Sequence, residues 1–137
     1  MLVAFYKSKK RFFNRFICYW LRGNYSHCEL LLKHLGGNRY LCGSSSFMDG
    51  GVRTKVIDLH PDRWDIVKVQ GDLMRARQWF VSHSGLGYDV LGIIGFVWRR
   101  TSDDRRKWFC SEAIAEALGY EDSWRFDPCT LAAAVKR

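Results

Sequence analysis

Two short segments that lie far apart in the chain carry the side chains best suited to chemistry. One is Tyr25-Ser26-His27, which precedes an apolar run, and the other is Phe109-Cys110-Ser111-Glu112, which precedes a run of helix formers. A thiol is a useful nucleophile only as the thiolate, and the first turn of a helix favours that anion through backbone N–H groups and the helix dipole. With His27 as the base for Cys110, the two segments predict a cysteine/histidine catalytic pair.

The local composition predicts the elements that hold this pair. Residues 111–118 are rich in helix formers, and Gly119 follows as a stop, which predicts a helix beginning beside Cys110. The apolar run 28–32 is short and soon ended by glycines, which predicts a largely buried strand with His27 at its start. The alternative for Cys110 is a buried thiol without chemistry.

The rest of the chain supplies a sheet and further helices. Strands are expected at 39–44, 52–59 and 66–69, and helices at 9–22 and from 73 to 83 with Asp72 as the N-cap. Cys129, after Pro128, is expected at a helix start. The predicted class is α+β, with an antiparallel sheet packed against helices that include the cysteine-bearing helix. At 137 residues the chain is expected to form a single domain, 1–137.

The order of these motifs resembles the circularly permuted papain-like branch of the NlpC-type cysteine peptidase superfamily. That branch includes YiiX-like hydrolases and lecithin:retinol acyltransferase-like enzymes. The resemblance rests on Tyr25-Ser26-His27 before aliphatic residues, on Gly87-Tyr88-Asp89 and on Phe109-Cys110-Ser111-Glu112, and it spans roughly residues 2–118. In the permuted branch, as here, the histidine strand precedes the cysteine helix.

The resemblance implies roles for individual residues. Cys110 would be the nucleophile and His27 its base, while Tyr88 would lie near the site and contact substrate. The family's third residue, which holds the imidazole, falls on Cys42. A thiol is a weak hydrogen-bond partner, so Ser44, a backbone carbonyl or a water would orient His27, or the site would be catalytically impaired.

The leading hypothesis is a cysteine hydrolase, a peptidase or amidase acting on cell-wall-like or other amide substrates. An acyltransferase or thioesterase acting on lipids is an alternative, and so is a non-catalytic basic module that binds anionic partners on the same fold. No cofactor is expected. No metal site is expected either, because no Cys-x-x-Cys or His-x3-His spacing is present, and Asp103-Asp104 lacks the alternating ligands of a calcium loop.

The net charge of +8 predicts attraction to anionic partners such as a cell wall or a membrane surface. Nucleic acid is not expected as the primary partner, because no recognition motif is present. The segment 9–22 predicts a helix with one apolar stripe and one basic face, and packing on the core is favoured over binding to a membrane. The apolar segment 90–98 is too short to span a bilayer, and 101–104 is expected to be a loop.

The five cysteines are odd in number and show no framework spacing, and no secretory signal is recognisable. These features predict reduced thiols in a cytoplasmic setting. The brevity of the chain suggests a bacterial or phage origin.

Overall fold

The computed structural model describes residues 1–7, 12–20, 22–88 and 107–136. Within these ranges, five strands form an antiparallel sheet in the order β5-β1-β2-β3-β4. The strands are β1 (Leu2–Tyr6), β2 (His27–Gly36), β3 (Arg39–Ser46), β4 (Gly51–Asp58) and β5 (Trp64–Lys68). Two short strands, β6 (Gly87–Tyr88) and β7 (Lys107–Trp108), extend the sheet beyond β4, and β7 runs parallel to β6.

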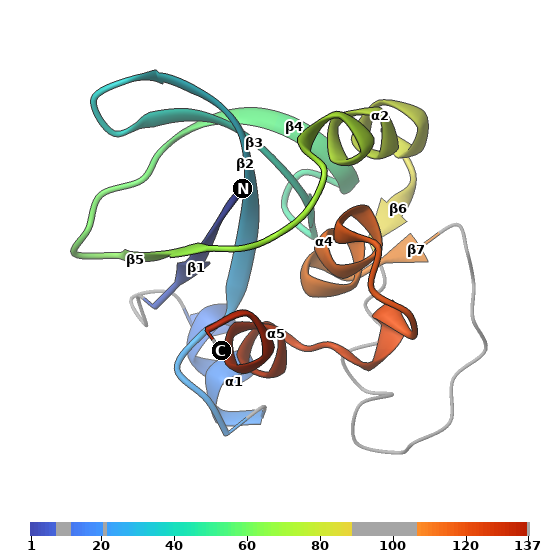
Figure 1. The fold of residues 1–137 in the computed structure, drawn as a ribbon. Coiled ribbons are helices and arrows are strands. Elements are labelled where there is room, and N and C mark those ends of the chain that lie inside the picture. Colours follow the sequence, from blue (N-terminus) through green and yellow to red (C-terminus); the bar gives the residue numbers. More distant parts are fainter. Residues whose placement is uncertain (8–11, 21, 89–106, 137) are drawn as a thin grey trace.

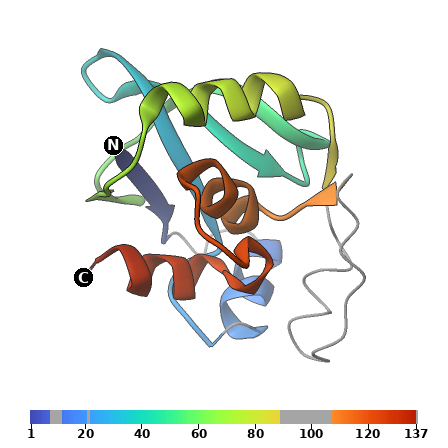
Figure 2. The ribbon, with the colours of Figure 1, turned by 45° about the vertical axis from the view of Figure 1, so that its right-hand side comes forward.

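The described helices are α1 (Phe12–Trp20), α2 (Leu73–His83), α4 (Cys110–Leu118) and α5 (Pro128–Val135), with a 3₁₀ turn η1 at Ser123–Arg125. In Figures 1 and 2, which differ by a turn about the vertical, α2 is uppermost, α4 lies below it, and α5 and α1 are lowest. The fold is therefore α+β, as the sequence predicts. Among the helices described, none is long and apolar enough to cross a bilayer.

The strand β2 lies at the centre of the core. Cys28, Leu30 and Leu32 pack into the main cluster, which the helices cover, while Leu31 joins a smaller cluster that includes Cys42. Alternate residues of a strand point to opposite faces, so β2 is buried on both sides over this stretch. The main cluster also takes side chains from β1, α2, α4 and α5, including Val3, Phe5, Phe80, Ile114 and Leu131.

Within the described residues the predicted strands and helices are confirmed, with small shifts of some boundaries. For the predicted helix 9–22 the described part is 12–20. Asp72 caps α2 by accepting hydrogen bonds from the backbone N–H groups of Met74 (2.8 Å) and Arg75 (3.2 Å). Gly119 ends α4 in the left-handed conformation, at φ 85°. Cys129 lies in the first turn of α5, as expected. The strand β1 was not predicted, because five apolar residues at a chain end give no distinctive period.

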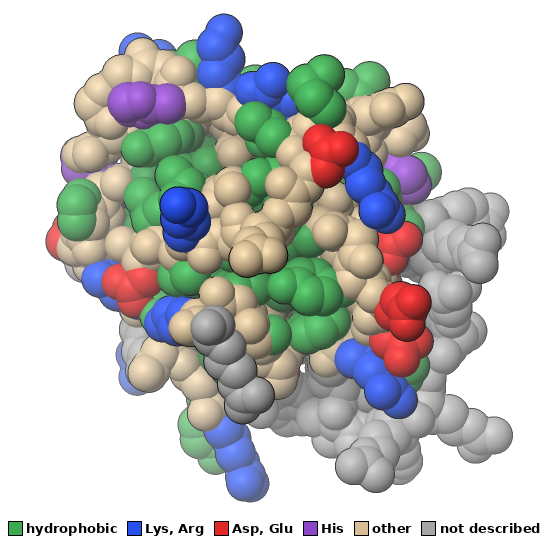
Figure 3. Space-filling view, viewed as in Figure 1, with side chains coloured by type: hydrophobic (Ala, Val, Ile, Leu, Met, Phe, Trp, Pro, Cys, Tyr) green, Lys and Arg blue, Asp and Glu red, His purple; other side chains and the backbone are tan. Residues whose placement is uncertain are grey.

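Several sequence predictions fall outside the described residues. These are the apolar segment 90–98, the loop 101–104, and the basic positions 9–11, 99–100 and 105–106. On the face seen in Figure 3, the described Lys and Arg side chains are spread over the surface and interspersed with Asp and Glu. The positive charge is therefore not gathered into one patch on that face.

Candidate active site

Cys110 is the first residue of α4, where the sequence placed it. The backbone before it is extended, with Phe109 at φ −82° and ψ 157°, and the Phe109 carbonyl accepts the first helical hydrogen bond, from the N–H of Ala113 (2.9 Å). The Phe109 N–H donates to the carboxylate of Glu112 at 3.2 Å, which fixes the first turn. The thiol therefore sits at the positive end of the helix dipole.

Two buried hydroxyl groups fix the backbone on either side of the thiol. Ser45 on β3 donates to the carbonyl of Trp108 at 2.6 Å, and Ser111 donates to the carbonyl of Phe126 at 2.6 Å. Both serines are fully buried. The first bond attaches the segment leading into α4 to the sheet, and the second attaches α4 to the segment before α5.

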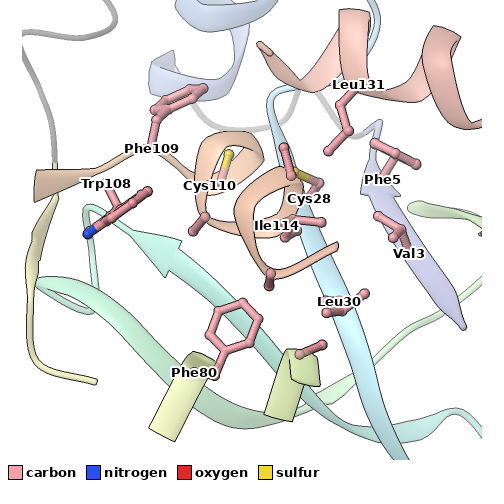
Figure 4. Close-up of a cluster of buried hydrophobic side chains, with 14 of the residues drawn as sticks. Val3, Phe5, Cys28, Leu30, Phe80, Trp108, Phe109, Cys110, Ile114 and Leu131 are labelled. Carbon is pink, nitrogen blue, oxygen red and sulfur yellow. The ribbon is translucent and has the colours of Figure 1, made fainter. Parts of the chain in front are cut away.

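The start of β2 brings two consecutive residues to Cys110. The side chains of His27 and Cys28 both have hydrogen-bond and charge interactions with the Cys110 side chain. Consecutive strand residues point to opposite faces, so a thiol contacted by both lies at the end of the strand and not above its middle. Figure 4 shows Cys110 in the first turn of α4 and Cys28 on the neighbouring strand.

The imidazole of His27 is held by a carboxylate from its own strand. Its Nε2 lies 2.8 Å from Oε1 of Glu29, whose side chain is only 1% exposed. Glu29 in turn accepts two hydrogen bonds from Arg53 on β4, at 2.8 and 2.6 Å. Arg53 Nε also donates to Asp49 at 2.8 Å. With Nε2 on the carboxylate, Nδ1 is the ring nitrogen left to exchange a proton with Cys110.

The sheet register explains how Arg53 reaches Glu29. Arg53 pairs with Ser44 on β3, and β3 is the neighbour of β2. The strands β4 and β2 are two strand spacings apart, about 10 Å. The long Arg53 side chain and the Glu29 side chain together bridge this distance. The fork geometry of the guanidinium matches a carboxylate in two parallel hydrogen bonds, and this pairing lets a buried acid remain charged.

The surroundings favour the thiolate of Cys110 and the imidazolium of His27. Burial alone would raise the pKa of Cys110, but hydrogen bonds from Cys28 and the charge of His27 lower it to about 5. Burial alone would lower the pKa of His27, but the thiolate and then Glu29 raise it to about 10. Both shifts favour an ion pair between the two side chains near neutral pH.

The neighbouring groups keep complementary protonation states. Burial, followed by the nearby Cys110, raises the pKa of Cys28 well above its ordinary value, so it remains a thiol and can donate to Cys110. Burial would raise the pKa of Glu29, but hydrogen bonds from Arg53 and His27 lower it. The site thus contains alternating charges: thiolate, imidazolium, carboxylate and guanidinium.

Cys42 and Ser44, the positions expected to orient His27, make other contacts. Cys42 Sγ lies 3.7 Å from the carbonyl of Tyr40, and burial raises the pKa of this thiol to about 12. The Ser44 hydroxyl donates to the carbonyl of Cys28 at 2.7 Å. The side chain that hydrogen-bonds His27 at Nε2 is Glu29, so the expectation for Cys42 and Ser44 does not match the contacts seen.

Tyr88 lies in β6, where its backbone pairs with Trp108, two residues before Cys110. The backbone of Tyr88 is therefore close in the sheet to the segment that carries the nucleophile, and substrate contact stays a prediction. Glu29 was missed by the sequence reasoning, although a signal was available. An acidic residue two positions after a candidate base, inside an otherwise apolar strand, points to the same face as that base.

The thiol is not open to solvent in this conformation. Cys110 is 0% exposed, whereas the side chain of His27 is 22% exposed. Of the two side chains, His27 is therefore the one that solvent reaches. Within the described ranges, no group of three or more His, Cys, Asp or Glu side chains is arranged to hold a metal ion.

No family model matches the chain, and neither the curated proteins nor the solved structures contain a match.

Proposed function

We propose that this protein is a cysteine hydrolase that cleaves amide bonds, a peptidase or amidase built on a papain-like fold in circularly permuted order. The observation that carries the proposal is the contact of Cys110, at a helix start, with an imidazole that Glu29 and Arg53 hold in place. The order of elements, with the histidine strand before the cysteine helix, is consistent with the permuted branch.

In the first half of the reaction, the Cys110 thiolate attacks the substrate carbonyl carbon and forms a C–S bond. Backbone N–H groups in the first turn of α4 stabilise the oxyanion. The imidazolium of His27 then donates its proton to the leaving amine as the C–N bond breaks, which leaves a thioester on Cys110. In the second half, His27 accepts a proton from water as the water oxygen attacks the thioester carbonyl and forms a C–O bond. The C–S bond then breaks, which releases the carboxylic acid and restores the Cys110 thiolate and the His27 imidazolium.

The preformed ion pair favours amides as substrates. An amine is a poor leaving group unless it is protonated, and an imidazolium with a raised pKa is already charged near neutral pH. Glu29 stabilises that cation and fixes the ring, which is the part an orienting carboxylate plays in a catalytic triad. Glu29 therefore replaces the third residue that the resemblance placed at Cys42.

The test is intact-protein mass spectrometry after brief exposure to a small acylating or alkylating probe. We expect one rapid addition to the wild type at neutral pH, lost in Cys110→Ala and slowed roughly 30-fold or more in His27→Ala, because an ordinary thiol is only a few per cent thiolate there. Cys129→Ala, which removes a half-buried thiol of raised pKa, is the matched control and keeps the rapid addition.

The same variants are then assayed on a panel of N-acyl amides. Turnover that requires both Cys110 and His27 supports the proposal. Slow labelling spread over several cysteines, unchanged in His27→Ala, would contradict it, and so would turnover that survives in Cys110→Ala.

A further inference from the structure

The helix α1 has an aromatic stripe that faces solvent. Phe12 and Tyr19 are 85% and 82% exposed, and Phe16 between them is 44% exposed. Their spacing of four and three residues puts them on one side of the helix, one above the other. Exposing the apolar surface of large aromatic rings to water is unfavourable in free energy. A stripe of three such rings on one short helix therefore indicates a surface used for contact.

The opposite side of α1 already provides its attachment to the domain. Ile17 and Cys18 are buried, and Ile17 belongs to the main cluster together with Cys110. The sequence analysis predicted a single apolar stripe, whereas the described side chains form two, one inward and one outward. Phe12 and Tyr19, the most exposed members of the outward stripe, are therefore not needed to pack the helix on the core.

The sequence that contains α1 has charges of one sign. The first 28 residues contain six Lys and Arg and no Asp or Glu. Arg15 lies on α1, is exposed and follows Phe12 by one helical turn, and the exposed Arg22 follows the helix. Figure 3 shows hydrophobic and basic side chains projecting together at the lower edge of the molecule, where α1 lies in Figure 1.

We propose that α1 docks the protein on an anionic lipid bilayer, with Phe12 and Tyr19 entering the interface and Arg15 and Arg22 contacting the headgroups. Exposed aromatic side chains beside basic ones are typical of helices that lie in the plane of a membrane surface. The basic side chains of this segment favour anionic over neutral lipid. This docking goes beyond amide cleavage and does not depend on it.

The docking surface and the candidate active site share one structural support. Ile17 anchors α1 in the cluster that contains Cys110, and α1 and α5 lie together below α4 in both ribbon views. A bilayer bound to the outer stripe of α1 would therefore lie at the same end of the molecule as the start of β2. The site would act near the membrane surface.

The experiment is flotation of the protein with vesicles of phosphatidylcholine alone or mixed with phosphatidylglycerol. The test variants are Phe12→Ala/Tyr19→Ala and Arg15→Glu. The matched control is Met74→Ala/Val81→Ala, which removes two similarly exposed apolar side chains from α2 at the opposite end of the molecule. Circular dichroism and thermal unfolding of each variant establish that it is folded.

We expect the wild type and the control to bind the anionic vesicles and to float far less with phosphatidylcholine alone. The aromatic double variant should bind about tenfold more weakly, and Arg15→Glu severalfold more weakly with a smaller response to salt. Cys110→Ala should bind like the wild type, so a failure of the proposed chemistry does not affect this test.

Three results would overturn the docking proposal. The first is that Phe12→Ala/Tyr19→Ala binds anionic vesicles as strongly as the wild type. Charged residues elsewhere on the protein would then account for the binding. The second is equal binding to neutral and anionic vesicles. The third is absence of vesicle binding together with self-association that Phe12→Ala/Tyr19→Ala abolishes, which would make the stripe a contact between copies of the chain.

Discussion

Glu29 holds His27 from two residues further along the same strand, with 2.8 Å between its Oε1 and Nε2 of the ring. A separation of two is the shortest at which strand residues share a face, so base and carboxylate are aligned by the pleat of β2 alone. Arg53 then fixes the carboxylate from the other side. The orientation of the base therefore depends on β2 and β4, and not on a loop.

Glu29→Gln should lower the turnover number on an amide substrate roughly 10²-fold or more, because the amide does not stabilise the imidazolium and can bind the wrong tautomer. Glu29→Ala should also lower the free energy of unfolding by about 3–5 kcal/mol, since it leaves Arg53 without its buried partner. Steady-state kinetics and urea unfolding measure the two effects.

Asp49→Asn is the control for Glu29, because it removes a carboxylate from Arg53 without touching His27. Its turnover should stay within a few-fold of the wild type. If Glu29→Gln behaved like Asp49→Asn, Glu29 would have only a structural role.

The ion pair predicts a specific dependence of stability on pH. The folded pKa of Cys110, about 5, is below the ordinary thiol value. The contribution of the thiolate to the free energy of unfolding is therefore fully present above about pH 8.5 and is lost as the pH falls through 5. The folded pKa of His27, about 10, is above the ordinary value. The contribution of the imidazolium to the free energy of unfolding is therefore fully present below about pH 6.5 and is lost as the pH rises through 10.

This dependence is measured as the free energy of unfolding in urea from about pH 4 to about pH 10, the window set by the two shifted groups. Subtracting the free energy of unfolding of Cys110→Ala/His27→Gln from that of the wild type isolates the pair together with Glu29 and Cys28, whose pKa values depend on it. Titrating groups that do not interact with the pair cancel. A difference that stays constant with pH would mean that the pKa values of the two side chains are the same in the folded and the unfolded protein, so that no ion pair forms.

Cys28→Ala should raise the pKa of Cys110, since it removes a hydrogen-bond donor to the thiolate. Cys28→Ser keeps a donor of similar size and should leave the titration close to that of the wild type. The ultraviolet absorbance of the thiolate reports the titration without a probe having to reach the buried sulfur. Equal curves for the alanine and serine variants would show that Cys28 only fills space.

Ser45→Ala should lower the free energy of unfolding by about 1–3 kcal/mol, because the buried carbonyl of Trp108 loses its donor. It should also slow acylation of Cys110, since this bond attaches the segment before α4 to the sheet. Ser82→Ala, which removes an exposed hydrogen bond to Trp79, is the comparison and should change stability by less than about 0.5 kcal/mol. Equal effects of the two changes would contradict the importance of the buried bond.

The sequence predicts the helix and the strand that carry the site better than the side-chain contacts within it. The helix beginning at Cys110 and the strand beginning at His27 both follow from local composition, which acts within a few residues. The resemblance predicts the partner of His27 on the next strand, at Cys42 or Ser44. Arg53 could not be assigned to Glu29, since that pairing depends on a register across three strands.

The two faces of α1 were also beyond reach of the pattern. Hydrophobic periodicity locates a stripe but does not say whether the domain or the solvent covers it. Phe12 and Ile17 contribute equally to an apolar pattern, and only the packed structure separates the exposed ring from the buried side chain.

The distance in sequence between His27 and Cys110 has a consequence during synthesis. A ribosome completes β2 and its carboxylate long before it reaches α4, and pairing of such distant segments is slow to form. Until β2 and α4 meet, the Cys110 thiol keeps an ordinary pKa of about 8.5 and is mostly protonated. In a nascent or unfolded chain the Cys110 thiol is therefore a weak nucleophile near neutral pH. The thiolate becomes the favoured form only after β2 and α4 have come together in the folded protein.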